Sequence, residues 1–188
     1  DLVERQWSLI SDGELRRAAE LLRSSARIFI TGSGSSLAGA WLLHSHIASR
    51  TTLASRLVAT SELLEARLTP SDVVVLVSQG FNRSDARLIA RRAEKNGAAM
   101  VVISAAAELP AEVVALRFLP AAEEERLFCR PAGVVTAYAA AGRLACAVAG
   151  DKFSQEECRR AVSAPLYHGG APLAAQLRNS AVVVVLAS

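Results

Sequence analysis

One short apolar run constrains the fold of this chain more than any other feature. Positions 73–78 are Val-Val-Val-Leu-Val-Ser, so a strand formed by them would be apolar on both faces up to its last residue. Side chains of a strand alternate between its two faces, and a strand that is apolar on both is typical of the interior of a parallel sheet. Parallel strands need crossover connections, which are usually helices. The run therefore predicts an α/β fold.

The rest of the chain supplies the alternation that such a fold needs. Further strands are predicted at 27–31, 57–60, 99–104, 113–119 and 182–186, and helices at 12–22, 36–49, 61–68, 83–95 and 131–148. Asp12 and Ser61 are the expected N-caps of the first and third helices. The pattern predicts a doubly wound domain of three layers with a parallel sheet between helices. We assign residues 1–178 to this domain, with residues 179–188 as a last strand that could begin a truncated second unit.

Composition and charge exclude several classes of protein. Of the 188 residues, 52% are hydrophobic, which is incompatible with an intrinsically disordered chain. The net charge of +3 comes from basic residues spread among acids, without the basic stripe of a nucleic-acid binder. The longest apolar run, 181–187, is too short to span a bilayer. Three cysteines without paired spacing favour a reducing, cytoplasmic setting.

Two loops have the composition of an anion site. The first contains Thr31 to Ser36 and follows the first strand, and the second contains Ser78 to Asp85 and follows the third. If the strand order is the flavodoxin-like 2-1-3-4-5, these strands are neighbours and both loops lead into helix N-termini, which favour anions. The candidate ligand-binding residues are Gly34, Ser35, Ser36, Ser78, Gln79, Gly80, Asn82 and Arg83. For either loop alone, an ordinary turn with a helix cap explains the composition equally well.

A dinucleotide site is the competing interpretation of the first loop. Gly32-Ser33-Gly34 opens like the dinucleotide fingerprint, but Leu37 stands where the third glycine belongs. Thr60-Ser61 also stands where an acidic residue would end the second strand. A nucleotide-binding α/β protein is therefore a minor alternative.

The loops and their surroundings resemble the SIS (sugar isomerase) domain family, including the isomerase half of glucosamine-6-phosphate synthase. The resemblance rests on Glu4-Arg5-Gln6-Trp7, Gly34-Ser35-Ser36, Ala59-Thr60-Ser61-Glu62 and Ser78-Gln79, and covers nearly all of the chain. It implies a five-stranded parallel sheet, a phosphorylated sugar as ligand, no cofactor, and a homodimer or a tandem SIS partner.

The second loop departs from the family pattern Ser-Gln-Ser-Gly-Glu-Thr. Gly80, Phe81 and Arg83 replace its second serine, its glycine and its threonine. Arg83 could replace the lost hydroxyl donors with a charged contact suited to phosphate. Phe81 is expected to narrow the pocket.

The resemblance also implies catalytic residues. Sugar isomerisation through an enediol needs a base that moves a proton between neighbouring carbons, and a group that opens the ring. The family's base corresponds to Glu124, and His168 is the candidate for ring opening. His44 and His46 are two residues apart on a predicted helix and face different ways, so no metal site is expected. We predict a domain that binds a sugar or a sugar phosphate, from an aldose–ketose isomerase or aminosugar enzyme, with a non-catalytic sugar-phosphate-sensing module as the alternative.

Overall fold

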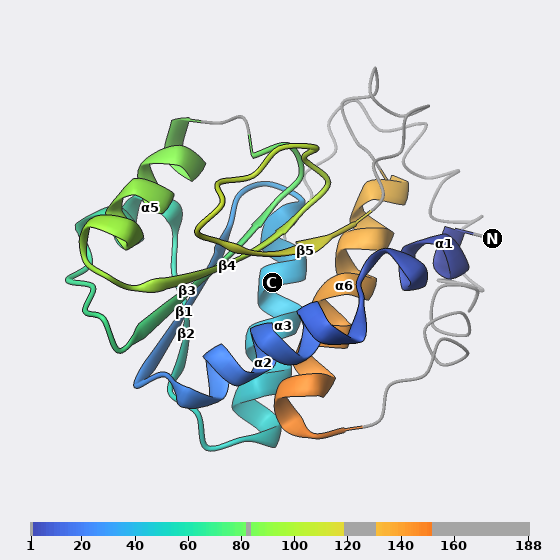
Figure 1. The fold of residues 1–188 in the computed structure, drawn as a ribbon, viewed down its shortest axis with the longest axis horizontal. Coiled ribbons are helices and arrows are strands. Elements are labelled where there is room, and N and C mark those ends of the chain that lie inside the picture. Colours follow the sequence, from blue (N-terminus) through green and yellow to red (C-terminus); the bar gives the residue numbers. More distant parts are fainter. Residues whose placement is uncertain (1, 82–83, 119–130, 152–188) are drawn as a thin grey trace, which may run out of the picture.

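The chain forms a parallel sheet covered by helices on both faces (Figure 1). The computed structural model describes residues 2–81, 84–118 and 131–151. Asn82, Arg83, Glu124, His168 and the whole of 152–188 lie outside the described residues. The expected strand at 182–186 and the assignment of 179–188 therefore stay predictions.

The sheet has five parallel strands in the order β2-β1-β3-β4-β5, which confirms the predicted architecture. The strands are β1 (Arg27–Gly32), β2 (Ser55–Leu57), β3 (Asp72–Ser78), β4 (Ala99–Ser104) and β5 (Val114–Arg117). The Val-rich β3 lies at the centre, and its first six residues are buried. Its register pairs Gly32 of β1 with Val77, and Ser78 with Ser104 of β4. The carboxyl ends of β1, β3 and β4 therefore lie at one edge of the sheet.

Helices cover the two faces unequally. One face packs against α2 (Asp12–Ser24), α3 (Ser36–Arg50) and α6 (Pro131–Ala149), and the other against α4 (Thr60–Glu65) and α5 (Ser84–Lys95). Alternate residues of β3 divide between the cores, with Val75 and Val77 on the three-helix face and Val74 and Leu76 on the two-helix face. None of the described helices is both long enough and apolar enough to span a membrane.

An unpredicted helix, α1 (Leu2–Leu9), begins the described chain and packs beside α6. Arg143 of α6 is 6% exposed and donates to the carbonyl oxygens of Trp7 and Ile10, at 2.8 and 3.0 Å. Its guanidinium carbon lies 4.5 Å from the centre of the Trp7 ring, within the range of a cation–π contact. Buried Gln6 donates to the carbonyl oxygen of Arg117 in β5. These long-range contacts, rather than a helix signal within the segment, hold α1 in place.

Two predicted caps and one strand were misplaced. Ser11, not Asp12, caps α2, because its hydroxyl accepts from the Glu14 N–H while the Glu14 carboxylate accepts from the Ser11 N–H. The second strand is Ser55–Leu57 rather than 57–60. Directly after β2, the N–H of Val58 donates to the carbonyl oxygen of Ile30 in β1. Helix α4 then begins at Thr60, and its N-cap is Ala59 rather than Ser61. A three-residue strand is too short for its alternation to mark its bounds.

The amino-terminal edge of the sheet carries a compact ion pair. Arg27 of β1 donates to both carboxylate oxygens of Asp72 at 2.8 and 2.7 Å, and the Asp72 side chain is fully buried. The backbone N–H and the hydroxyl of Thr69 also donate to Asp72. The hydrogen bonds from Arg27, followed by those from Thr69, lower the pKa of Asp72 below its usual value despite its burial.

Candidate functional site

The carboxyl ends of β1 and β3 approach each other so closely that only glycine fits at the end of β1. A Cβ atom on Gly32 would lie 2.9 Å from the backbone oxygen of Ser36 and 3.1 Å from that of Val77. Both obstacles are backbone atoms, which cannot rotate away as a side chain could. Gly32 therefore sets the first turn of α3 directly against the end of β3.

The turn after β1 presents small polar groups at this edge. Gly34 has a φ of +59° and open space around it, and it leads into Ser35 at the N-cap of α3. The Ser35 side chain makes no capping hydrogen bond, and neither the Ser35 nor the Ser36 hydroxyl bonds to a described residue. Two hydroxyl groups thus stand at the N-terminus of a fifteen-residue helix, where the helix dipole favours an anion.

The turn after β3 is held by its own side chain and by the neighbouring strand. The Ser78 hydroxyl accepts from the Phe81 N–H at 3.3 Å, which closes the turn. The carbonyl oxygen of Gln79 accepts from the Ala105 N–H at 3.0 Å and from the Ser104 hydroxyl at 3.3 Å. We name residues 78–81 the β3 turn. Its position is set by its own closing hydrogen bond and by the end of β4.

A small hollow brings the two turns together. Ser35 and Ser36 line it from one side and Gln79 from the other, with Phe118, Gly133, Val134 and Ala137 completing its wall. Its volume of about 10 Å³ accommodates roughly one water molecule or one ligand oxygen. None of these described lining residues is acidic or basic, and three of them, Ser35, Ser36 and Gln79, have polar side chains. We name this hollow, beside the N-terminal part of α6, the cradle.

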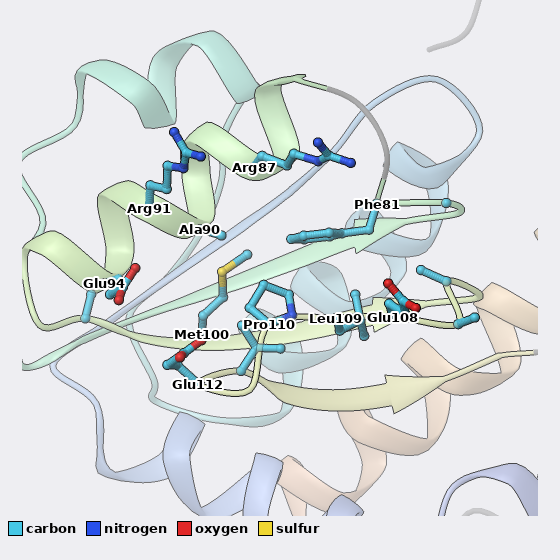
Figure 2. Close-up of a pocket in the computed structure, with 15 residues that line it drawn as sticks. Phe81, Arg87, Ala90, Arg91, Glu94, Met100, Glu108, Leu109, Pro110 and Glu112 are labelled. Carbon is cyan, nitrogen blue, oxygen red and sulfur yellow. The ribbon is translucent and has the colours of Figure 1, made fainter.

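Phe81 does not narrow this hollow, contrary to the sequence-based expectation. Phe81 is 7% exposed and belongs to the core on the opposite face, with Ala86 and Ile89 of α5. There it lines a groove of about 690 Å³ between α5 and residues 106–113, which we name the α5 groove. Figure 2 shows the ring directed into this groove alongside Met100. The cradle and Phe81 therefore lie on different sides of the β3 turn.

The structure brings together some of the predicted ligand-binding residues and not others. Ser35, Ser36 and Gln79 line the hollow, and Gly34 forms the turn beside it. Ser78 closes the β3 turn instead, and Gly80 lines the α5 groove. Asn82 and Arg83, like the catalytic candidates Glu124 and His168, lie outside the described residues.

Sequence reasoning missed the contribution of α6 to the hollow. The helix was expected to begin at Pro131, as it does, but its first residues were not considered near the two loops. Gly133 was the available signal, because a glycine in the first turn of a helix allows close approach of another chain segment. Among the described residues, no group of three or more His, Cys, Asp or Glu side chains could hold a metal ion.

Solved structures of known proteins share this fold. The sugar isomerase domain of the RpiR transcription factor from Sphaerobacter thermophilus matches at 16% identity and a TM-score of 0.64, covering 94% of this chain and 92% of that one. The NanR protein of Vibrio vulnificus, solved with ManNAc-6P, matches at 19% identity and a TM-score of 0.68, covering 96% and 67%. The C-terminal domain of glucosamine-fructose-6-phosphate aminotransferase from Francisella tularensis matches at 17% identity and 0.61, covering 85% and 48%. At these identities the likeness shows the fold alone.

The sequence itself identifies the family. A comparison with curated proteins finds no match. The family model of the SIS domain matches residues 21–144, which is more than half of the chain and extends from α2 to Leu144 in α6. The match includes the turns after β1 and β3 and the first residues of α6, which together form the cradle. The chain belongs to the SIS domain family.

Proposed function

We propose that this domain binds a sugar phosphate at the cradle, with the phosphate group on the turn after β1. The observation that carries the proposal is that Ser35, Ser36 and Gln79 converge on one hollow at the ends of neighbouring strands. Two further facts support an anion there. No described residue that lines the hollow is acidic, and Ser35 and Ser36 stand at the N-terminus of α3.

The size of the hollow decides how a phosphate would sit. A volume of about 10 Å³ admits a single oxygen rather than a whole phosphate group. Ser35 is exposed, so the remaining phosphate oxygens would lie on the rim formed by Gly34 and Ser35. The sugar would then extend outward from the sheet edge.

Binding is tested by calorimetry with matched ligands and variants. The probes are N-acetylmannosamine 6-phosphate, glucosamine 6-phosphate, the two unphosphorylated sugars, inorganic phosphate and ADP. We expect the phosphorylated sugars to bind and the free sugars not to. The double variant Ser35→Ala/Ser36→Ala should weaken binding at least tenfold, on the order of two lost hydrogen bonds to a charged group. Ser49→Ala, at the other end of α3, is the matched control.

Three outcomes contradict this function. Binding of ADP with no binding of sugar phosphates would select the nucleotide-binding alternative. Equal affinities of the double variant and wild type would place the site elsewhere. Equal affinities for free sugars and sugar phosphates would show that the phosphate group is not bound at the cradle.

Catalysis is the finer part of the proposal and rests on the sequence. We assign proton transfer to Glu124, in the acidic stretch at 123–125 before α6, and ring opening to His168. An isomerase exchanges the C2 proton of its sugar with solvent, and NMR in D₂O follows that exchange. Exchange that Glu124→Gln abolishes supports the isomerase, whereas binding without exchange selects the sensing module. Exchange that survives in Glu124→Gln rejects Glu124 as the base.

A further inference from the structure

The backbone of Phe81 adopts a conformation that its side chain disfavours. Its φ is +50°, and it is the only described residue other than glycine with a positive φ. A bulky residue in the left-handed region is a genuine outlier, because its Cβ atom crowds the neighbouring carbonyl oxygen. Such a conformation persists only where surrounding contacts impose it.

Phe81 is held both by its ring and by its backbone. The ring is buried against α5 and the sheet, and Figure 2 shows it directed into the α5 groove. The N–H of the same residue donates to the Ser78 hydroxyl. Phe81 is therefore attached at both ends: its ring to the α5 groove and its backbone to the β3 turn.

The turn that Phe81 closes is the one that carries Gln79 into the cradle. Gln79 lines the hollow opposite Ser35 and Ser36, while its carbonyl oxygen is held by Ala105 and Ser104. A change of φ at position 81 would break the bond to Ser78, which closes the turn. Phe81 and Gln79 thus belong to one hydrogen-bonded turn, and the backbone of residue 81 is part of what shapes it.

We propose that Phe81 is the positioning residue of the cradle: its ring, anchored in the α5 groove, holds the backbone of residue 81 in the left-handed conformation that closes the β3 turn and keeps Gln79 beside Ser35 and Ser36. This assignment rests on the proposed function for its effect on ligand binding. Its effect on the turn itself is independent of any ligand. The residue acts from the face of the sheet opposite the cradle's helices, without lining the hollow.

The test compares variants that separate the ring from the backbone. Phe81→Gly removes the ring but accepts a positive φ without penalty, whereas Phe81→Ala removes the ring and keeps the penalty. We expect the Ala variant to bind N-acetylmannosamine 6-phosphate and glucosamine 6-phosphate about tenfold more weakly than the Gly variant. A residue that only fills the core would give the two variants equal affinities. Equal affinities, or the reverse order, overturn the proposal.

A second pair of variants keeps most of the apolar volume, in case the small side chains prevent folding. Phe81→Leu and Phe81→Ile have the same volume, but the β-branched Ile is much less tolerant of a positive φ. The Leu variant should bind more tightly than the Ile variant and closer to wild type than either small variant. Equal binding by Leu and Ile also overturns the proposal.

A ligand-free measurement distinguishes failure of this inference from failure of the proposed function. The amide of Ala105 donates to the Gln79 carbonyl and is chemically unchanged in every variant. Its hydrogen exchange, followed by NMR, should be about tenfold faster in the Ala variant than in the Gly variant. If wild type binds no probe, the proposed function fails, and the exchange order still decides the role of Phe81. The same exchange rate in both variants rejects that role.

Discussion

The two edges of the sheet use their polar side chains in opposite ways. At the amino-terminal edge, Asp72 is fully buried and accepts from Arg27 and Thr69. At the carboxyl edge, the hydroxyls of Ser35 and Ser36 have no hydrogen-bond partner among the described residues, although both stand at a helix N-terminus. The first arrangement is a network of hydrogen bonds within the fold, whereas the second has none with the described residues. Substitutions at the two edges should therefore separate stability from binding.

Substitution of Gly32 should give the largest change in stability, and because Gly32 lies at the carboxyl edge it should also weaken ligand binding. Gly32→Ala would place its Cβ against the backbone of Ser36 and Val77. We expect the free energy of unfolding to fall by about 3 kcal/mol, the upper range for overpacking. Guanidinium denaturation followed by circular dichroism measures this loss.

Gly39→Ala, a few residues along in α3, is the control for Gly32→Ala. Its Cβ would lie at an ordinary 3.5 Å from the nearest atom, a side-chain methyl of Val77. Because alanine is the better helix former, that variant should gain up to about 1 kcal/mol. Equal effects of the two substitutions would show that the sheet edge is less tightly packed than described.

Asp72 should give the next largest effect, confined to stability. Asp72→Asn removes the charge that Arg27 and Thr69 contact, and a hydrogen bond to a charged group contributes about 1.5–3 kcal/mol. Arg27 is partly exposed, so we expect a smaller loss of about 1–2 kcal/mol in the free energy of unfolding. Ligand affinity should be unchanged, and a tenfold loss of affinity would contradict the separation of the two edges.

The same carboxylate predicts how stability depends on pH. Its pKa is lower in the folded protein than in the unfolded chain, so the folded state releases the proton more readily. The stabilisation is fully present above the unfolded value of about 3.9 and is lost as pH falls below it through the folded pKa. Denaturation midpoints measured from pH 6 down to pH 2.5 should fall less steeply in Asp72→Asn than in wild type. Parallel curves would mean that other carboxylates govern acid unfolding.

The two serines should give the smallest change in stability. Neither hydroxyl bonds to a described residue, so Ser35→Ala/Ser36→Ala should leave the free energy of unfolding within about 0.5 kcal/mol of wild type. Thermal denaturation without ligand checks this. A loss of more than 1 kcal/mol would show that the hydroxyls serve the fold, as the Thr69 hydroxyl does.

Elements with a local sequence signal were predictable, whereas an element held by contacts with distant segments was not. The all-apolar run of β3 and the Pro131 start of α6 are local signals, and both predictions are confirmed. Helix α1 was not predicted, because the residues that hold it in place, Arg143 and Arg117, are more than a hundred residues away in sequence. Strand β2 was misplaced because three residues carry too little alternation to define its bounds.

The candidate site was predictable only in outline, for a similar reason. Strand order placed the turns of Ser35 and Gln79 side by side, as expected. The direction of Phe81 depends on a positive φ, a property usually associated with glycine, and the sequence carries no glycine at that position. The use of Ser78 within its own turn likewise depends on backbone geometry. Composition pointed to two loops that the structure brings together, but not to which of their side chains line the hollow between them.

The central position of β3 also has a kinetic consequence. Its partner on one side, β1, lies some 45 residues earlier in the chain, as the pairing of Arg27 with Asp72 shows. The middle of the sheet can form only after a long intervening segment has been enclosed, which makes folding a matter of milliseconds to seconds rather than microseconds. Because β3 is hydrogen-bonded to a strand on each side, its backbone amides should have the slowest hydrogen exchange in the domain. They should exchange only when the whole domain unfolds.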